Sequence, residues 1–512
     1  MDRVGDQAVT QISLEEDINL PENKPDVNLI YLQRARLVVE EARAVNGVVN
    51  IRGRLHYSLL YQTLERGSSL VRLEGGIPFE EKIRMDEVSA SDPVLAQGTV
   101  EDLTINLINT RKLQLQSVIT LKVWTEKLTD LAVPIGVSDG DSLEYRRQSF
   151  PVAQMTVDKR DVLRIREEIS LPAHYPNIYQ ILWSNIAPGD LEFKVSDGRI
   201  LARGDVQLFL IYEGEGEDRP IRSFETAIPF SNTMECSGCE EGMLPDISYE
   251  LVQQDLTVKP DQDGEERKLE LELSMDLRVH IYREESVEIV TDLYGVSSDV
   301  ETVTEEASLQ QVLTKVTGKS KLSERIRVAG DKDPILQILH SEGEIVPESE
   351  KIVENGILLQ GVLDVKVMYV TGDDETPYAC TGAKIPYQYT LEVPGIKPED
   401  VIKIFVTPEQ LQVAMLDGEE MDAKAVLSFS TIVLRRLPID LISEVKISPP
   451  DHAKLRRLPG IIIYTVRKGD SLWSIGRKYY VSVDSLKEWN NLTDDELQIG
   501  QKLLIVKEVP EI

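Results

Sequence analysis

A frame of one glycine, one tyrosine and one proline occurs three times along this chain of 512 residues. Seven residues separate the glycine from the tyrosine, and sixteen separate the tyrosine from the proline. The three copies are Gly53–Tyr61–Pro78, Gly204–Tyr212–Pro229 and Gly361–Tyr369–Pro386. Their glycines lie 151 and 157 residues apart, a period that is too long for a solenoid repeat and suits a whole domain. The sequence therefore predicts three versions of one domain.

Apolar and polar residues alternate through the segment that leads to each tyrosine. In the first copy one face consists of Val49, Ile51, Gly53, Leu55, Tyr57, Leu59 and Tyr61. A period of two predicts a half-buried β-strand, because successive side chains point to opposite faces of a sheet. The glycine lies on the buried face, where a missing side chain indicates a bulge or a close backbone approach. The proline is predicted at a strand end or on an edge strand.

A second alternating segment closes each repeat, at residues 113–123, 269–281 and 423–433. Before each first strand, three apolar residues have the spacing of a helical turn, so we expect one short helix per repeat. These sets are Val27/Ile30/Tyr31, Ile178/Ile181/Leu182 and Ile335/Ile338/Leu339. The pattern predicts a mainly β chain of antiparallel domains, sandwich-like or partly closed. The residues do not decide between a sandwich and a barrel.

The chain is strongly acidic, with a formal net charge of −32. This charge disfavours nucleic-acid binding and attraction to anionic membranes, because both need a surplus of Lys and Arg on some face. The N-terminus shows no secretory signal, and no apolar run is long enough for a membrane span. Three cysteines give no disulfide framework and fit a reducing compartment. We therefore expect a cytosolic protein that does not insert into a membrane.

The pattern changes near the C-terminus. Residues 449–460 contain prolines, a glycine and three cations, which predicts a linker. An alternating strand then leads to Asp470 or Ser471, either of which is placed to cap a helix. Ser482 is placed to cap a second helix, and a last alternating strand follows. The sequence predicts a small β-α-α-β domain at residues 461–507.

This segment resembles a LysM domain. The resemblance rests on Tyr464 to Ile475 (YTVRKGDSLWSI), on Asn490-Asn491-Leu492 and on Ile499-Gly500-Gln501-Lys502-Leu503. In that family two loops form a shallow groove for glycans that contain N-acetylglucosamine. By resemblance, one side of the groove here is Gly469, Asp470, Ser471 and Leu472, and the other is Leu497, Gln498, Ile499 and Gly500. Most LysM loops have proline where this chain has Ile499.

The repeats resemble the SPOCS domain of spore-forming Firmicutes. This resemblance rests on Leu171-Pro172, the glycine–tyrosine strand, Ile228-Pro229-Phe230 and Thr291-Asp292-Leu293-Tyr294. With a C-terminal LysM domain, the chain is similar to the SipL and SpoVID group of endospore morphogenetic proteins. The similarity implies SPOCS-type repeats at residues 1–150, 151–305 and 306–448, of which the first is divergent.

What this group does gives further expectations. Its members are made in the mother-cell cytoplasm and recruited to the forespore surface and spore coat, which needs no signal peptide. The implied partner is a morphogenetic ATPase that polymerises on the forespore surface, or another spore-envelope protein. The LysM domain can serve in that contact, and a glycan containing N-acetylglucosamine is the other candidate ligand.

Motifs of enzymes and metal sites are incomplete in this sequence. Gly136-Val137-Ser138-Asp139-Gly140 matches the G-x-S-x-G pattern of hydrolases, but it lies in a polar connection between two β repeats. Cys236-Ser237-Gly238-Cys239 could be half of a zinc site or a redox pair, but zinc needs four ligands, and we favour a surface loop with free thiols. The five histidines are scattered. We predict no catalytic residues, no metal and no cofactor.

The favoured hypothesis is a non-enzymatic scaffold for assembly of the endospore coat and cortex, whose LysM domain docks to a forespore-surface protein. A second hypothesis is a protein that binds peptidoglycan or cortex glycan through the LysM groove, with the repeats as a spacer. The least favoured is a cell-wall hydrolase that the LysM domain targets to its substrate.

Overall fold

The computed structural model describes residues 2–64, 69–86, 88–128, 131–137, 143–328, 333–373, 375–449 and 459–506. The first repeat holds β1 (Asp2–Asn19), β2 (Val27–Val45), β3 (Val48–Thr63), β4 (Leu70–Arg84), β5 (Val94–Asn109) and β6 (Lys112–Leu128). The second holds β7 (Leu143–Ser170), β8 (Ile178–Ser196), β9 (Arg199–Gly214), β10 (Ile221–Glu235), β11 (Leu244–Pro260) and β12 (Glu266–Gly295). The third holds β13 (Asp299–Arg327), β14 (Gln337–Val353), β15 (Gly356–Val370), β16 (Tyr378–Glu392), β17 (Val401–Met415) and β18 (Glu420–Ser448).

Each repeat contains two three-stranded antiparallel sheets that pack face to face. Their strand orders are β1-β6-β5 and β2-β3-β4, then β7-β12-β11 and β8-β9-β10, then β13-β18-β17 and β14-β15-β16. One apolar cluster joins the two sheets of each repeat; in the second, Leu271 of β12 and Leu208 of β9 belong to the same cluster. The predicted antiparallel β class is confirmed, and the repeats are β-sandwiches. The division of the chain at residues 150, 305 and 448 stays a prediction.

The short helix predicted before the first strand of each glycine–tyrosine hairpin is wrong. Val27, Ile30 and Tyr31 lie in β2, and their counterparts lie in β8 and in or just before β14. The cause is a pair of β-bulges: the pairing register shifts between Val27 and Leu29 and again between Ile30 and Leu32. Each extra residue moves the next apolar side chain to the other face of the strand. An extended strand therefore shows the spacing of a helical turn.

The repeated glycine lies where two neighbouring strands approach it closely. A Cβ on Gly53 would lie 2.4 Å from the Val38 carbonyl oxygen on β2 and 2.6 Å from the Phe79 ring on β4. Phe79 is also the residue that pairs with Gly53 in the sheet. Pro78, next to it, lies on the edge strand β4, where its missing N–H breaks no ladder. Both backbone predictions from the frame are confirmed.

The repeated tyrosine ties its strand to the segment that enters the sheet. The buried hydroxyls of Tyr61 and Tyr212 donate to the carbonyl oxygens of Pro25 and Pro176, at 2.9 and 3.1 Å. In the third repeat the corresponding proline lies one position later along the sequence. There the buried hydroxyl of Tyr369 has no hydrogen-bond partner among the described residues. The third copy keeps the tyrosine and has lost this anchor.

The interpretation of Cys236 and Cys239 as free thiols in a surface loop is wrong. Their sulfurs form a disulfide, and both side chains are buried in the core of the second repeat. The backbone of Gly198 is hydrogen-bonded to both cysteines: its N–H donates to the Cys239 carbonyl oxygen, and its carbonyl oxygen accepts from the Cys236 N–H, both at 2.9 Å. Cys380, the third cysteine, takes no part in this disulfide. The G-x-S-x-G segment lies partly outside the described residues.

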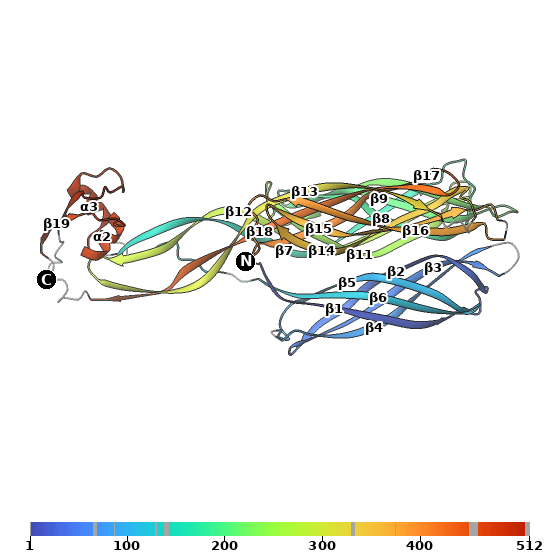
Figure 1. Ribbon diagram of the computed structural model, residues 1–512, viewed down its shortest axis with the longest axis horizontal. Coiled ribbons are helices and arrows are strands. Elements are labelled where there is room, and N and C mark those ends of the chain that lie inside the picture. Colours follow the sequence, from blue (N-terminus) through green and yellow to red (C-terminus); the bar gives the residue numbers. More distant parts are fainter. Residues whose placement is uncertain are drawn as a thin grey trace.

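Four long strands continue past the second and third sandwiches as an arm, which comprises residues 143–152, 285–311 and 435–448. β7, β12, β13 and β18 have 28, 30, 29 and 29 residues, whereas β1 and β6 of the first repeat have 18 and 17. The β7–β12 ribbon packs on the β13–β18 ribbon through small apolar clusters; Leu293 and Ile442 meet in one of them. The arm connects the sandwiches to the C-terminal domain (Figure 1).

The three sandwiches meet at one apolar cluster, which we call the junction. Its buried members are Tyr31, Leu32, Leu60, Leu70, Leu182, Trp183, Ile211, Leu339 and Met368. An ion pair between Arg34 of the first repeat and Glu342 of the third lies at its side. The Tyr31 hydroxyl donates to Gln62 at 2.6 Å, and Gln62 donates to the Glu375 carbonyl oxygen at 2.7 Å. Both apolar burial and polar contacts therefore hold the first repeat to the third.

The ion pair makes this contact sensitive to acid. The side chains of Glu342 and Arg34 are only 12% and 29% exposed. Burial raises the pKa of Glu342, but the Arg34 guanidinium and the His340 imidazole outweigh it and hold the pKa at about 2. Since this value lies below that of an unfolded glutamate, the charged carboxylate stabilises the folded protein above about pH 4.5. The contribution is lost as the pH falls toward 2.

We predict that replacing Glu342 by Gln changes the acid dependence of stability. Wild type should lose about 2–3 kcal/mol relative to Glu342→Gln between pH 5 and pH 2, because only wild type must protonate this carboxylate. Denaturant unfolding of both proteins across that range measures the difference, and the remaining carboxylates cancel. A difference that stays constant with pH would contradict the assignment.

A second prediction concerns the frame glycine of the third repeat. Gly361→Ala places a Cβ 2.5 Å from the Val346 carbonyl oxygen and should destabilise the protein by about 1–3 kcal/mol. Gly372→Ala in the same repeat is the matched control, because a Cβ there meets no atom within 4 Å. Denaturant unfolding compares the two variants, and equal stabilities would show that the close approach is not what requires glycine.

Candidate ligand-binding interface

The C-terminal domain consists of β19 (Ile461–Thr465), α2 (Leu472–Tyr479), α3 (Val483–Asn490) and β20 (Lys502–Val506). Its two strands pair antiparallel, and its core contains Val466, Leu472, Ile475, Val481, Leu486, Leu503 and Ile505. Ser482 caps α3 by accepting from the Ser485 N–H, and Asn491 ends it in the left-handed conformation. The predicted β-α-α-β order is confirmed.

The first candidate loop is a tight turn between β19 and α2. Asp470 accepts the Arg467 N–H and the Tyr464 hydroxyl, both at 2.7 Å, and these hydrogen bonds hold the pKa of Asp470 below its usual value. Gly469 has a φ of +92°, which favours glycine. Ser471, rather than Asp470, caps α2 and forms a capping box with Ser474. Asp470 therefore shapes the loop, and Ser471 starts the helix.

The second candidate loop lies beside the first. The Gly500 N–H donates to the Val466 carbonyl oxygen, and the Val466 N–H donates to Gln501, both at 2.9 Å. Gln498 is exposed, and Ile499 has 72% of its surface exposed, which is high for an isoleucine. These bonds hold the start of the first loop against the end of the second.

Some of the eight candidate residues are buried in the domain core, and the others are accessible at the surface. Leu472 is 2% exposed and Leu497 packs against the same core, so both side chains stabilise the domain itself. The accessible members are Gly469, Ser471, Gln498, Ile499 and Gly500, with Asp470 half-buried. Their role in binding stays a prediction.

Helix α2 is docked on the tip of the arm. The Trp473 indole N–H donates to Asp292 at 2.7 Å, and the Arg477 guanidinium donates to both oxygens of the same carboxylate, at 3.0 and 3.2 Å. The Tyr294 hydroxyl donates to the Val481 carbonyl oxygen at 2.9 Å, and its ring meets Trp473 edge to face at 4.8 Å. The Asp292–Tyr294 segment of the second repeat thus holds the C-terminal domain.

This contact joins motifs that the sequence shows separately. Trp473 belongs to the LysM pattern and Asp292 to the end of a SPOCS-type repeat, and no periodicity connects them. One local signal is Gly476, because glycine inside a helix is costly and needs a reason. A Cβ on Gly476 would lie 2.4 Å from the Tyr294 hydroxyl and 2.6 Å from the Val481 carbonyl oxygen. The missing side chain at Gly476 therefore lets Tyr294 of the arm and the backbone that follows α2 both lie close to the helix.

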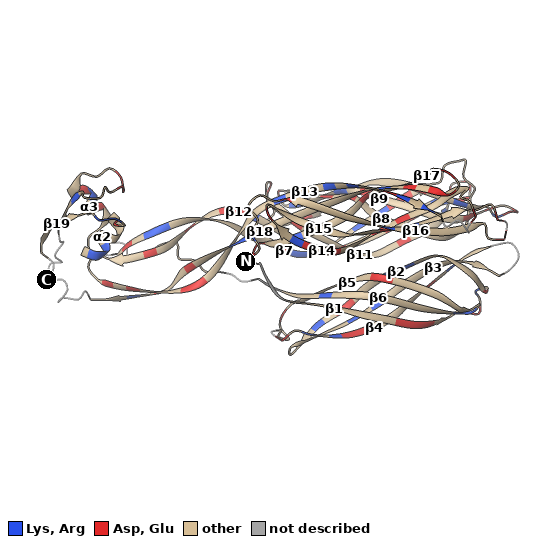
Figure 2. Cartoon of the chain, in the orientation of Figure 1, with Lys and Arg blue, Asp and Glu red and all other residues tan. Residues whose placement is uncertain are grey.

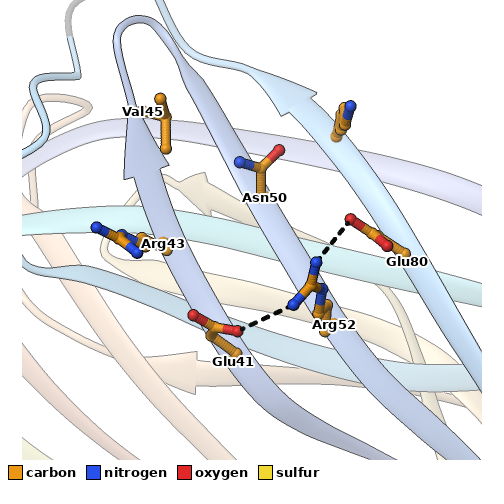
Figure 3. Close-up of a pocket in the computed structure, with 7 residues that line it drawn as sticks. Glu41, Arg43, Val45, Asn50, Arg52 and Glu80 are labelled. Carbon is orange, nitrogen blue, oxygen red and sulfur yellow. Dashed lines mark hydrogen bonds and ion pairs between the residues drawn. The ribbon is translucent and has the colours of Figure 1, made fainter.

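A concavity on the outer face of β2, β3 and β4 is lined by charged residues, among which Arg52 pairs with Glu41 and Glu80 at 3.8 and 3.5 Å (Figure 3). These three side chains are more than half exposed. Within the described ranges, no His, Cys, Asp or Glu cluster could hold a metal ion, and no helix could span a membrane.

Comparisons with known proteins match the repeats and the C-terminal domain. The family model "SipL, SPOCS domain" matches residues 11–108, 177–259 and 334–416, which together make just over half of the chain. The model "LysM domain" matches residues 464–506. Both matches follow the repeats and the C-terminal domain that the sequence patterns indicate. No solved structure matches this chain.

The curated relatives share the C-terminal domain alone. Cell wall-binding protein YocH of Bacillus subtilis is 52% identical over 44 residues, which are 9% of this chain and 15% of that protein. A probable N-acetylmuramidase of Lactococcus lactis is 45% identical over 40 residues, 8% of this chain and 9% of its own. An autolysin of Enterococcus faecalis is 46% identical over 44 residues, 9% of this chain and 6% of its own. The chain therefore spans no more than 15% of these relatives' lengths.

We predict that Asp292 is the main polar support of the docked domain. Asp292→Ala removes the acceptor for Trp473 and Arg477, and should weaken the contact by about 1–2 kcal/mol. Hydrogen exchange of residues 472–481 in the full chain should then quicken. Asp440→Ala, an exposed carboxylate on β18 of the same arm, is the matched control and should leave the exchange unchanged. Equal exchange in both variants would contradict the role of Asp292.

Proposed function

Because this chain belongs to the SipL, SPOCS domain family, we propose that it is a non-enzymatic morphogenetic scaffold of the bacterial endospore envelope. Its LysM domain docks to a protein on the forespore surface, and a polymerising morphogenetic ATPase is the partner that the family resemblance favours. Both matched domain types, LysM and SPOCS, are non-catalytic. The family implies a role in sporulation, and the LysM domain implies the capacity to bind glycan.

The observation that carries this proposal is the placement of the LysM domain. It sits at the end of the arm that lies farthest from the three sandwiches (Figure 1). Its α2 face contacts the arm, whereas Gly469, Ser471, Gln498 and Ile499 are exposed. A recognition surface held at the end of an arm suits a protein that links one surface to another.

The LysM domain differs in charge from the rest of the chain, which supports this arrangement. Residues 461–507 contain seven Lys or Arg and six Asp or Glu, whereas the whole chain has a net charge of −32. Figure 2 shows acidic residues along the strands of the sandwiches and of the arm. An acidic partner surface would be repelled by the sandwiches and could still approach the nearly neutral LysM domain. The arm places the LysM domain at the other end of the molecule from the sandwiches (Figure 1).

Glycan binding is the alternative function, and the LysM relatives favour it. The relative YocH is named a cell wall-binding protein, and its similarity to this chain is confined to the domain that bears the candidate groove. In this alternative the LysM domain holds cortex peptidoglycan and the repeats act as a spacer. A hydrolase is disfavoured, because the muramidase and autolysin relatives share only the LysM segment with this chain.

We predict that the LysM domain is required for recruitment. A chain truncated after residue 460, which lacks the LysM domain, should lose its forespore localisation in sporulating cells, as measured with a fluorescent fusion. Normal localisation of this truncated protein would contradict the proposal. A pull-down with purified sacculi separates the two functions, because a protein-binding LysM domain leaves the chain in the supernatant.

Two surface variants test which face of the LysM domain is used. Ile499→Asp in the second candidate loop should reduce recruitment roughly five- to thirtyfold, the effect expected of losing an apolar contact of about 1–2 kcal/mol. Ile461→Asp is the matched control, because Ile461 is 67% exposed on the outer face of β19. Loss of recruitment only in the Ile461 variant would assign the partner to the sheet instead.

A further inference from the structure

The junction between the sandwiches is built from the same positions of all three repeats. Each position recurs at the offsets of 151 and 157 residues that separate the frame glycines. Four such triplets are Tyr31/Leu182/Leu339, Leu32/Trp183/His340, Leu60/Ile211/Met368 and Leu70/Ile221/Tyr378. Chance placement of three domains would not bring equivalent residues together at four positions. The sandwiches therefore surround a pseudo-threefold axis.

A β-bulge creates this shared face. The pairing register shifts between Ile30 and Leu32, between Ile181 and Trp183, and between Ile338 and His340, at equivalent points of β2, β8 and β14. Before the bulge, Ile30 packs into the core of its own sandwich. After it, Tyr31 and Leu32 are buried in the junction. The extra residue redirects the strand from one core to the other.

The contacts run in the same direction from each repeat to the next. β4 of the first repeat contacts β8 of the second, and β16 of the third contacts β2 of the first. These strands are equivalent, since β4 and β16 carry the frame proline and β2 and β8 carry the bulge. The second repeat meets the third through Phe209, whose ring stacks on His340 at 3.9 Å. Head-to-tail contacts that return to their start form a closed ring.

One position in the ring distinguishes the three repeats by charge. It holds Arg34 in the first repeat, Asn185 in the second and Glu342 in the third. Arg34 pairs with Glu342 and also lies over the Trp183 ring at 5.1 Å. The guanidinium donates to the Ser184 carbonyl oxygen at 3.3 Å as well. The first repeat thus contributes a cation that contacts both other repeats.

We propose that this face of the SPOCS domain is a docking surface whose partner is another SPOCS domain. In this chain the three covalently linked domains form a ring, which the non-covalent Arg34–Glu342 pair closes between the first repeat and the third. The opposite charges at this position favour contact between the first repeat and the third over contact between two like repeats, because like charges at a partly buried contact repel. A ring opened at this point presents both faces to a second copy of the chain.

Charge reversal tests the closing contact in the full chain. Arg34→Glu and Glu342→Arg each place like charges together and should open the ring, while Arg34→Glu/Glu342→Arg should close it again. Cys380 is the reporter, because its thiol lies outside the disulfide and its side chain packs against the junction. Its labelling rate with a thiol reagent should rise roughly tenfold or more in each single variant, as expected for local opening, and return to the wild-type rate in the double variant.

Mixing the two single variants tests the docking surface itself. The reversed first repeat of one chain complements the reversed third repeat of the other, and the remaining pair is native. Sedimentation velocity should show a heterodimer in the mixture and monomers in each separate sample. Arg52→Glu is the matched control, because Arg52 is 61% exposed on the outer face of the first repeat, and it should behave as wild type.

Each result of the labelling and sedimentation experiments either supports or overturns the proposal. Wild-type labelling in the single variants, or fast labelling that persists in the double variant, would overturn the assignment of the closing pair. Opened single variants that form no heterodimer would overturn the docking surface. If Arg34→Glu fails to fold, Glu342→Gln should still raise the labelling rate by a smaller factor, and an unchanged rate would overturn the proposal.

Discussion

The arrangement of the whole molecule depends on a β-bulge that lets one strand serve two apolar cores. An unbulged strand buries alternate residues on one face, and its other face is left for solvent. In β2, the register shift between Ile30 and Leu32 ends this alternation, so that Ile30 belongs to the sandwich and Leu32 to the junction. Because β8 and β14 have the same shift, three sandwiches bury a common cluster. Their alignment then brings the long strands of the second and third repeats together as an arm.

The sequence predicts the parts of the fold that depend on local backbone chemistry. Gly53 and Pro78 indicate a close approach and an edge strand, and both are present, because few other residues meet those backbone requirements. The bulge is also where sequence reasoning failed. Val27, Ile30 and Tyr31 have the spacing of a helical turn, and spacing alone cannot separate a helix from a strand that changes faces. The redox pair was only the less favoured interpretation of Cys236 and Cys239, because their burial depends on the whole sandwich.

The candidate site was predictable only within its own domain. Ser471 and Asp470 follow from capping and turn rules, and the fold places them as neighbours in the first loop. The contact of Trp473 with Asp292 joins residues 181 positions apart, and neither residue carries a local signal for the other. Such a contact follows from how the arm and the LysM domain pack, which a single sequence does not encode in any short pattern.

A docked LysM domain differs physically from one on a free tether. A flexible tether would let the domain sample many orientations, and a partner that binds the domain would have to offset the loss of that freedom. Asp292 and Tyr294 restrict the domain before any partner arrives, so less freedom is lost on binding. The same restriction leaves Gln498 and Ile499 exposed while it covers the α2 face. Contacts thus continue from the junction of the sandwiches, through the packed ribbons of the arm, to the docked LysM domain, and together they determine where the recognition loops lie.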